Sequence, residues 1–194
     1  MRFAAPIRTV LQPLVIAVGL AAAARAAMHI YAIPSASMAP TLEPGDQIVV
    51  TRYFGAEPER GHVIVFHSPL RTDELMVKRV VAVPGDLIDS RLGRVRIGEH
   101  TLPEPYVLQE ATSGAIPMQL VPADSYFVLG DNRADSLDSR SWGVVPRTQI
   151  VGRARLVLWS SSDAQRDVVM AEGDAHVARA PRTSGSGRIF KWVE

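Results

Sequence analysis

The sequence predicts a mostly β protein, made of short antiparallel strands and preceded by one N-terminal transmembrane helix. Outside the N-terminal segment, no long window shows the apolar spacing of a helix. Turn-forming residues instead recur about every ten positions, as they do between short strands. The third observation is the uncharged run near the N-terminus, which is the most apolar stretch of the chain. With 194 residues, 47% of them hydrophobic, the chain has room for one domain with its own core.

The N-terminal segment predicts a membrane anchor over residues 9–27. Residues 9–24 are uncharged, and Arg25 extends the usable span because its long side chain reaches the membrane surface. Arg2 and Arg8 precede this span, so the positive-inside rule places residues 1–8 in the cytoplasm and the remainder on the outer face of the cytoplasmic membrane. A cleaved signal peptide is the alternative, since a basic start and an alanine-rich end fit that pattern too. Both interpretations export the folded part.

The predicted strands follow in order, each bounded by turn residues. Their ranges are 45–54, 61–69, 74–83, 93–102, 124–132 and 149–162. The fourth range is a small hairpin with Gly98 at its turn. We therefore expect a β-domain over 28–162 with a small, loop-rich extension at about 90–124. A polar tail, 163–194, comes last, and its final residues either pack back on the domain or contact the membrane.

Composition argues against several classes of function. The formal net charge is +1 and the arginines are scattered, which gives no case for binding nucleic acid. Without cysteine, the chain can form no disulfide, no thiolate nucleophile and no Cys-ligated metal site. No HExxH motif, histidine cluster or pair of acidic ligands indicates a metal.

The loop "IPSASMAPTLEPGD", residues 33–46, follows the apolar segment and contains Ser35 and Ser37. Its composition is that of an ordinary linker, but a reactive serine close to a membrane is the sharper interpretation. A serine nucleophile needs a base, and histidine is the usual one. The five histidines form no recognisable constellation with a serine and an acid.

Lys78 is the alternative base. Only two of the 21 basic residues are lysines, and this one lies inside the apolar run "ELMVKRVVAV". Strand alternation places it on a face with apolar side chains only. Burial there disfavours the ammonium form, lowers the pKa and allows the amine to accept a serine proton. The competing interpretation is a lysine at a strand edge whose amine reaches solvent.

A third segment, "GDNRADSLDSRSWGVVP" at 130–146, places several polar residues in one loop after a strand. A surface turn is the simple interpretation, with Asp138 and Arg140 forming an ion pair of little energetic weight. Ser136 lies two residues before this pair and could hydrogen-bond to a nearby amine.

Taken in order, the three segments resemble the signature boxes of type I signal peptidase, the membrane-bound Ser/Lys endopeptidase family. "PSASMAPTL" is similar to its nucleophile box, "VKRVVAVPGD" to its general-base box and "GDNRADSLDSRSWG" to its third box. The resemblance covers residues 24–160 and includes "IVGRARLVLWS". It implies that Ser37 is the nucleophile, Lys78 the general base, and Ser35 an oxyanion-hole donor beside the Ser37 backbone N–H.

The resemblance also implies roles for surrounding residues. Ser136 would orient the lysine amine, and Asp131, Asp138 and Arg140 would brace the site. Shallow apolar pockets for small substrate residues would be formed near Ile33, Pro34, Met38, Leu42, Met76 and Val77.

The implied activity is removal of N-terminal signal peptides from exported preproteins after Ala-x-Ala sequences, with no cofactor and no metal. The implied partners are preprotein signal peptides and membrane lipid, without nucleic acid, and no feature indicates an oligomeric state. Only about 40 residues separate Asp86 from Asp131, so the second β-domain of larger members is at most rudimentary here. The alternatives are a pilin-processing peptidase of the same clan, a self-cleaving repressor, which the apolar N-terminus disfavours, and a non-catalytic exported β-barrel binding module.

Overall fold

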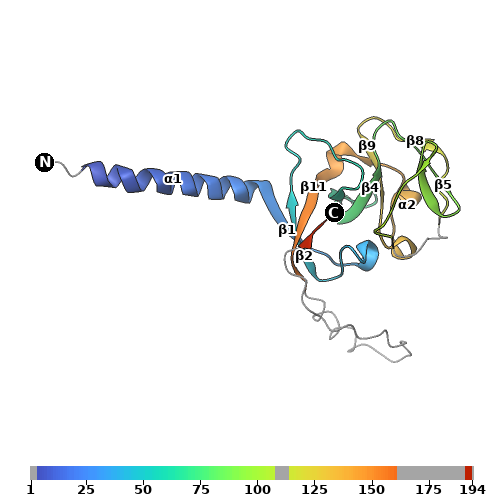
Figure 1. The fold of residues 1–194 in the computed structure, drawn as a ribbon, viewed down its shortest axis with the longest axis horizontal. Coiled ribbons are helices and arrows are strands. Elements are labelled where there is room, and N and C mark those ends of the chain that lie inside the picture. Colours follow the sequence, from blue (N-terminus) through green and yellow to red (C-terminus); the bar gives the residue numbers. More distant parts are fainter. Residues whose placement is uncertain (1–3, 108–113, 161–190, 194) are drawn as a thin grey trace, which may run out of the picture.

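The protein folds as two antiparallel β-sheets attached to one long N-terminal helix (Figure 1). This computed structural model describes residues 4–107, 114–160 and 191–193. The predicted mostly β class is confirmed, because the described residues after the first helix lie mainly in strands and the turns between them.

Helix α1 (Ala4–Ala27) extends away from the sheets and runs directly into the first strand (Figure 1). Its described apolar side chains are exposed, including Leu11, Val15 and Val18 at 55–63%. A membrane span was predicted at 9–27, but no helix in the described part of the chain combines sufficient length with sufficient hydropathy to cross a membrane.

The larger sheet has eight strands in the order β1-β2-β11-β3-β4-β9-β10, with β12 also paired to β11. Residues of β3 and β9 are almost all buried, which explains their uninterrupted apolar sequences. The strands are β1 (Met28–Ala32), β2 (Asp46–Thr51), β3 (Val63–His67), β4 (Leu75–Ala82), β9 (Ser125–Leu129), β10 (Val145–Pro146), β11 (Ile150–Ser160) and β12 (Lys191–Trp192).

The smaller sheet occupies the region where the sequence predicts an extension. Its order is β7-β6-β5-β8, with β5 (Leu87–Arg91), β6 (Arg94–Ile97), β7 (His100–Thr101) and β8 (Gln119–Leu120). The predicted hairpin is confirmed: β6 pairs with β7, and Gly98 at the turn has a φ of 60°. This sheet packs its apolar face against Phe127 and Leu129 of β9, so the extension shares a core with the main sheet.

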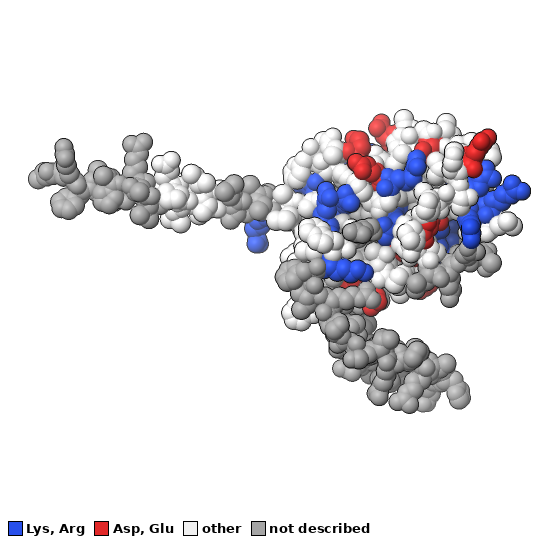
Figure 2. Space-filling view, in the orientation of Figure 1, with Lys and Arg blue, Asp and Glu red and all other residues white. Residues whose placement is uncertain are grey.

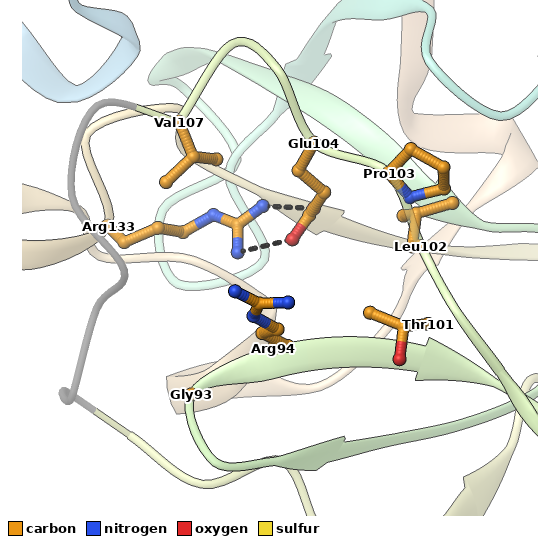
Figure 3. Close-up of a pocket in the computed structure, with 8 residues that line it drawn as sticks. All are labelled: Gly93, Arg94, Thr101, Leu102, Pro103, Glu104, Val107 and Arg133. Carbon is orange, nitrogen blue, oxygen red and sulfur yellow. Dashed lines mark hydrogen bonds and ion pairs between the residues drawn. The ribbon is translucent and has the colours of Figure 1, made fainter.

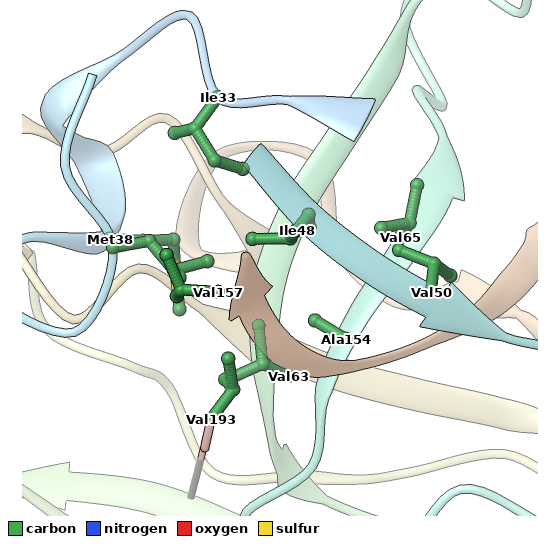
Figure 4. Packing of buried hydrophobic residues seen from close by; sticks show 10 residues of the cluster. Ile33, Met38, Ile48, Val50, Val63, Val65, Ala154, Val157 and Val193 are labelled. Carbon is green, nitrogen blue, oxygen red and sulfur yellow. The ribbon is translucent and has the colours of Figure 1, made fainter. Parts of the chain in front are cut away.

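The core beneath the first strands includes Ile33, Met38 and Ile48 together with Val193 from the C-terminal end (Figure 4). Val193 is only 6% exposed, and β12 pairs with Leu156 and Val157 of β11. Of the two expectations for the final residues, 191–193 follow the first, because strand pairing and apolar burial return this short segment to the domain. Residues 163–190 lie outside the described residues.

Four short helices complete the described fold, and three of them surround the candidate site. They are η1 (Ala36–Met38), η2 (Arg133–Asp135), α2 (Ser139–Trp142) and η3 (Arg147–Gln149). On the face that Figure 2 shows, Lys and Arg atoms are interspersed with Asp and Glu atoms. This mixture agrees with the formal net charge of +1.

Candidate active site

Ser37 and Lys78 meet across the site. The Lys78 Nζ lies 2.7 Å from the Ser37 Oγ and donates a hydrogen bond to it. Lys78 comes from the middle of β4, whereas Ser37 lies in the single turn η1. The neighbouring Asn132 fixes η1 from behind, since its backbone N–H donates to the Ser37 carbonyl at 3.1 Å and its side chain donates to the Ala36 carbonyl at 3.2 Å. Strand β4 and the turn η1 are thus joined by a hydrogen bond to the Ser37 hydroxyl.

Burial controls the charge of Lys78, which is only 3% exposed. Loss of hydration disfavours the ammonium and lowers the pKa of Lys78 to about 8, although Asp138, Asp131 and Asp135 act in the opposite direction. Among the described residues, none of these carboxylates forms an ion pair with the amine; Asp131 pairs with Arg79 and Asp138 with Arg140. With this pKa, about a tenth of the amine is neutral at pH 7 and about half at pH 8, and a neutral amine can accept a proton.

Ser35 lies beside Ser37. Its Oγ is 3.2 Å from the Ser37 Oγ, and its backbone is extended, with φ of −134° and ψ of 160°. Ser35 immediately precedes η1, so its exposed hydroxyl and the backbone N–H of Ser37 belong to the same tight turn. Two donors in such a turn can stabilise negative charge on one oxygen atom.

Asp138 organises the third loop. Its buried carboxylate accepts hydrogen bonds from the Ser136 hydroxyl at 2.8 Å, the Gly130 N–H at 3.1 Å and the Arg140 side chain at 2.8 Å. It also caps α2 by accepting from the Arg140 N–H. Ser136 thus directs its hydroxyl proton to Asp138, and the predicted contact between Ser136 and the Lys78 amine is not among the hydrogen bonds of the described residues.

Sequence patterns did not single out Arg79 as a site residue, yet it is one of the most buried charges of the region. It is 1% exposed and binds Asp131 with two nitrogens, Nε at 2.9 Å and Nη2 at 2.7 Å. Thr41 donates to the same carboxylate at 2.6 Å. The available signal was a second basic residue adjacent to Lys78 in an apolar strand, because a buried arginine requires a carboxylate partner.

Gly130 permits these two loops to approach each other. A Cβ atom at this position would lie 2.2 Å from the Ser136 Oγ and 2.5 Å from the Ser37 carbonyl oxygen. Neither distance is sterically possible, and the carbonyl belongs to the backbone of Ser37 itself. A side chain at position 130 would therefore displace η1 or the Ser136 loop.

A pocket of about 180 Å³ opens beside Ser37 and Lys78. Five of the six predicted substrate-binding residues line it: Ile33, Pro34, Met38, Met76 and Val77. Leu42 does not line it, because its side chain is fully buried in the core beneath η1. The other lining residues include Tyr31, Val65 and Leu75, so the walls are largely apolar.

The described residues contain no cluster of three or more His, Asp or Glu side chains suited to a metal ion. Among these residues no histidine hydrogen-bonds to Ser37. His62 instead accepts a hydrogen bond from the Glu59 N–H and lies 3.2 Å from the Tyr53 hydroxyl. Among the described residues, the side-chain nitrogen that hydrogen-bonds to the Ser37 hydroxyl is therefore the Lys78 amine.

Comparison with known proteins connects this geometry to a family. Residues 7–159 match the family model described as signal peptidase, peptidase S26. A signal peptidase I from Leptolyngbya laminosa is 43% identical over 136 residues, covering 66% of each chain. A probable signal peptidase I-2 from Synechocystis sp. is 34% identical over 179 residues, covering 84% of this chain and 79% of the relative. Thylakoidal processing peptidase 1 of Arabidopsis thaliana is 35% identical over 142 residues, covering 67% of this chain and 42% of the relative.

The match thus spans about two thirds or more of the two cyanobacterial relatives and less than half of the plant one. A crystal structure of a signal peptidase I from Enterococcus faecalis shares 29% identity and a TM-score of 0.45, covering 50% of this chain and 96% of that one. Because the family match extends over most of the sequence, the chain belongs to the signal peptidase I family, peptidase S26, a family of serine endopeptidases.

Proposed function

We propose that this protein removes signal peptides from exported preproteins by means of a Ser37–Lys78 dyad. The observation that carries the proposal is the 2.7 Å contact between the Lys78 Nζ and the Ser37 Oγ, made by an amine that is almost completely buried. Family membership supports the reaction type, and the apolar pocket beside the serine supports the substrate class.

The first step is attack by Ser37. In the neutral state of Lys78 the contact reverses its direction: the hydroxyl donates and the amine accepts. As the Oγ attacks the scissile carbonyl carbon, its proton moves to the Lys78 Nζ and a new C–O bond forms. The resulting ammonium is buried close to Asp138 and Asp131, whose charges favour it.

The oxyanion is stabilised by the donors of η1. We assign the backbone N–H of Ser37 and the hydroxyl of Ser35 to this role, because both belong to the turn that carries the nucleophile. Collapse of the tetrahedral intermediate breaks the C–N bond, and Lys78 returns its proton to the leaving amine. A water molecule then hydrolyses the acyl-enzyme by the same proton transfers in sequence.

The remaining loops hold the dyad in place. Ser136 and Asp138 lie against Gly130, which touches the Ser37 backbone, so we infer that they position the nucleophile and the lysine together. Asp131 and Arg140 complete this frame through their own ion pairs. The frame restricts movement around the reacting atoms, as efficient catalysis requires.

The family resemblance implies specificity for small residues, and the apolar lining of the pocket supports it. Ile33, Met76 and Val77 provide apolar walls in a pocket of about 180 Å³. Alanine methyl groups at the two positions that enter the pocket would pack against these walls. We therefore propose cleavage after Ala-x-Ala sequences.

We further propose that α1 attaches the catalytic domain to the outer face of the cytoplasmic membrane, with residues 1–8 on the cytoplasmic side. The exposed apolar side chains of Leu11, Val15 and Val18 support this, because in water they would cost free energy. If the full chain is extracted from membranes by alkaline carbonate, the anchor is excluded. A shortened mature protein that lacks α1 would instead support a cleaved signal peptide.

The decisive test uses Ser37→Ala and Lys78→Arg in a cleavage assay with an Ala-x-Ala preprotein. Both should lose at least about 10³-fold in kcat, since one removes the nucleophile and the other retains charge but cannot act as a base. Thr148→Ser, on the exposed surface of η3, is the control that should retain activity. Normal cleavage by Lys78→Arg would exclude the dyad.

The same assay separates the alternatives. A pilin-processing peptidase would cleave its own precursor and leave ordinary preproteins intact. A non-catalytic binding module would bind a preprotein without cleaving it.

A further inference from the structure

A segment that follows β7 of the smaller sheet contacts the back of the candidate active site. Residues 102–107, which we name the strap, follow β7 and lead away from the smaller sheet. Leu102 packs in the core of that sheet, and its N–H donates to the Val95 carbonyl at 2.9 Å. The other end of the strap carries Glu104 and Tyr106 toward β4 and the loop after β9.

Tyr106 covers the Arg79–Asp131 ion pair. The Arg79 guanidinium lies 4.0 Å from the centre of the Tyr106 ring, a cation–π contact. The remaining Arg79 groups are occupied by Asp131, the Gly61 carbonyl and Thr41, so the ring covers a charge that is otherwise enclosed. The Tyr106 hydroxyl donates to the Glu104 carboxylate at 3.1 Å.

Glu104 continues the chain of contacts to the catalytic loop. It forms a buried, two-nitrogen ion pair with Arg133 (Figure 3). The Arg133 Nε in turn donates to the Gly130 carbonyl at 2.9 Å. The Arg133 carbonyl accepts from Arg140, the partner of Asp138. Glu104 and Arg133 together line a pocket of about 390 Å³ beside Arg94 and Val107. The strap thus contacts Arg79 directly and reaches Arg140 only through Arg133, and none of its residues lines the pocket beside Ser37.

We propose that Tyr106 and Glu104 of the strap are positioning residues for the general base, because they enclose the Arg79–Asp131 pair and fix the loop that bears Asp138. The inference rests on the proposed function of Ser37 and Lys78. It also assigns a purpose to the smaller sheet, which anchors the strap against the catalytic domain.

The charge balance around Lys78 explains how the strap acts. The carboxylates that face the amine are Asp138, Asp131 and Asp135, and the cations that compensate the first two are Arg140 and Arg79. Removal of the Tyr106 ring admits water to the Arg79–Asp131 pair and loosens it. Asp131 then becomes less well compensated, which favours the ammonium form of Lys78 and raises its pKa.

The test compares Tyr106→Leu with Tyr106→Phe, which retains the ring. Tyr106→Leu should lower kcat at pH 7 about threefold, because a half-unit rise in the pKa of Lys78 leaves about a third as much neutral amine. It should raise the midpoint of the kcat–pH profile by about half a unit and leave KM unchanged, because no strap residue lines the substrate pocket. Tyr106→Phe should retain most of the activity and the wild-type midpoint.

Asp89→Asn is the matched control, because it breaks the Asp89–Arg96 ion pair of the same small sheet without touching the strap. If Asp89→Asn loses as much kcat as Tyr106→Leu, the effect is general loosening of the sheet and the inference fails. It fails equally if Tyr106→Leu keeps both the wild-type kcat and the wild-type midpoint. Should Tyr106→Leu not fold, Glu104→Gln carries the same test with an expected loss of about threefold.

A readout independent of activity separates this inference from the proposed function. Lys78 and Lys191 are the only two lysines, so protein labelled with ¹³C at the lysine ε-carbon gives two side-chain NMR signals. The signal lost in Lys191→Arg identifies the other as Lys78. A higher Lys78 midpoint in Tyr106→Leu supports the strap even if the wild type cleaves no preprotein, whereas an unchanged midpoint overturns it.

Discussion

Lys78 and Arg79 are adjacent in β4 but lie in opposite electrostatic environments. Both are nearly inaccessible to solvent, at 3% and 1% exposure. Arg79 is bound by the Asp131 carboxylate and by two further oxygen acceptors, whereas the Lys78 amine contacts the Ser37 hydroxyl. Burial lowers the pKa of Lys78 to about 8, whereas the buried Arg79 guanidinium is compensated by its two-nitrogen contact with Asp131.

The difference shows how one strand can carry structure and chemistry at neighbouring positions. A buried charge with a complete set of partners stabilises one arrangement of the chain, and its removal leaves the partner uncompensated. A buried amine without a carboxylate in contact costs folding free energy, but it gains the ability to accept a proton. The Lys78 amine thus lies next to the Arg79–Asp131 ion pair in the chain but does not take part in it.

The largest expected difference between Lys78 and Arg79 lies in the effect of methionine substitution on stability and on cleavage. Arg79→Met leaves Asp131 buried without its cation and should lower the free energy of unfolding by about 3–5 kcal/mol. Lys78→Met removes a costly buried amine, so stability should be unchanged or higher while cleavage is abolished. Urea unfolding and a preprotein cleavage assay on the same samples measure both effects. Equal destabilisation by the two substitutions would contradict the contrast.

Loss of the Ser35 hydroxyl should have the next largest effect. Ser35→Ala should lower kcat by about 10²–10³-fold with little change in KM, because an oxyanion donor acts mainly in the transition state. Ser35→Thr retains a hydroxyl and is the matched control. Ser35 is exposed, and within the described part of the chain its hydroxyl hydrogen-bonds only to Ser37, so stability should not change. If Ser35→Ala cleaves within threefold of wild type, another group stabilises the oxyanion.

Local sequence patterns predicted much of the fold and singled out Ser37 and Lys78, the central pair of the site. The apolar runs of β3, β4 and β9 predicted strands because burial on both faces leaves no polar alternation. Lys78 was conspicuous because lysine is rare in this chain and its neighbours are apolar.

What the sequence did not predict depends on contacts between distant segments. The pairing of Arg79 with Asp131 joins residues 52 positions apart, and the contact of Tyr106 with Arg79 requires the smaller sheet to be docked. The sequence left open whether the final residues return to the domain, and the burial of Val193 depends on pairing with β11 across a long sequence separation. The family resemblance implied that Leu42 is a pocket residue, but its side chain is fully buried in the core beneath η1.

The smallest expected effect concerns pH and tests the state of Lys78 directly. Its pKa is about 8 in the folded protein and about 10.5 in the unfolded chain, so the unfolded chain binds more protons between these values. Stability contributed by this group should therefore rise as pH increases from about 8 to about 10.5, by at most about 3 kcal/mol. Over a lower range, cleavage should increase with pH to a midpoint near 8, since only the neutral amine acts as base.

Lys78→Met provides the reference, because it lacks this titration but retains the other groups. The difference in free energy of unfolding between wild type and Lys78→Met should shrink as pH rises through this window, if the variant is the more stable protein at pH 7. Arg79→Met should keep the upward trend, since Lys78 is still present. If the difference in free energy of unfolding between wild type and Lys78→Met stays constant from about pH 8 to about pH 10.5, Lys78 titrates like an exposed lysine. The proposed difference between Lys78 and Arg79 would then be wrong.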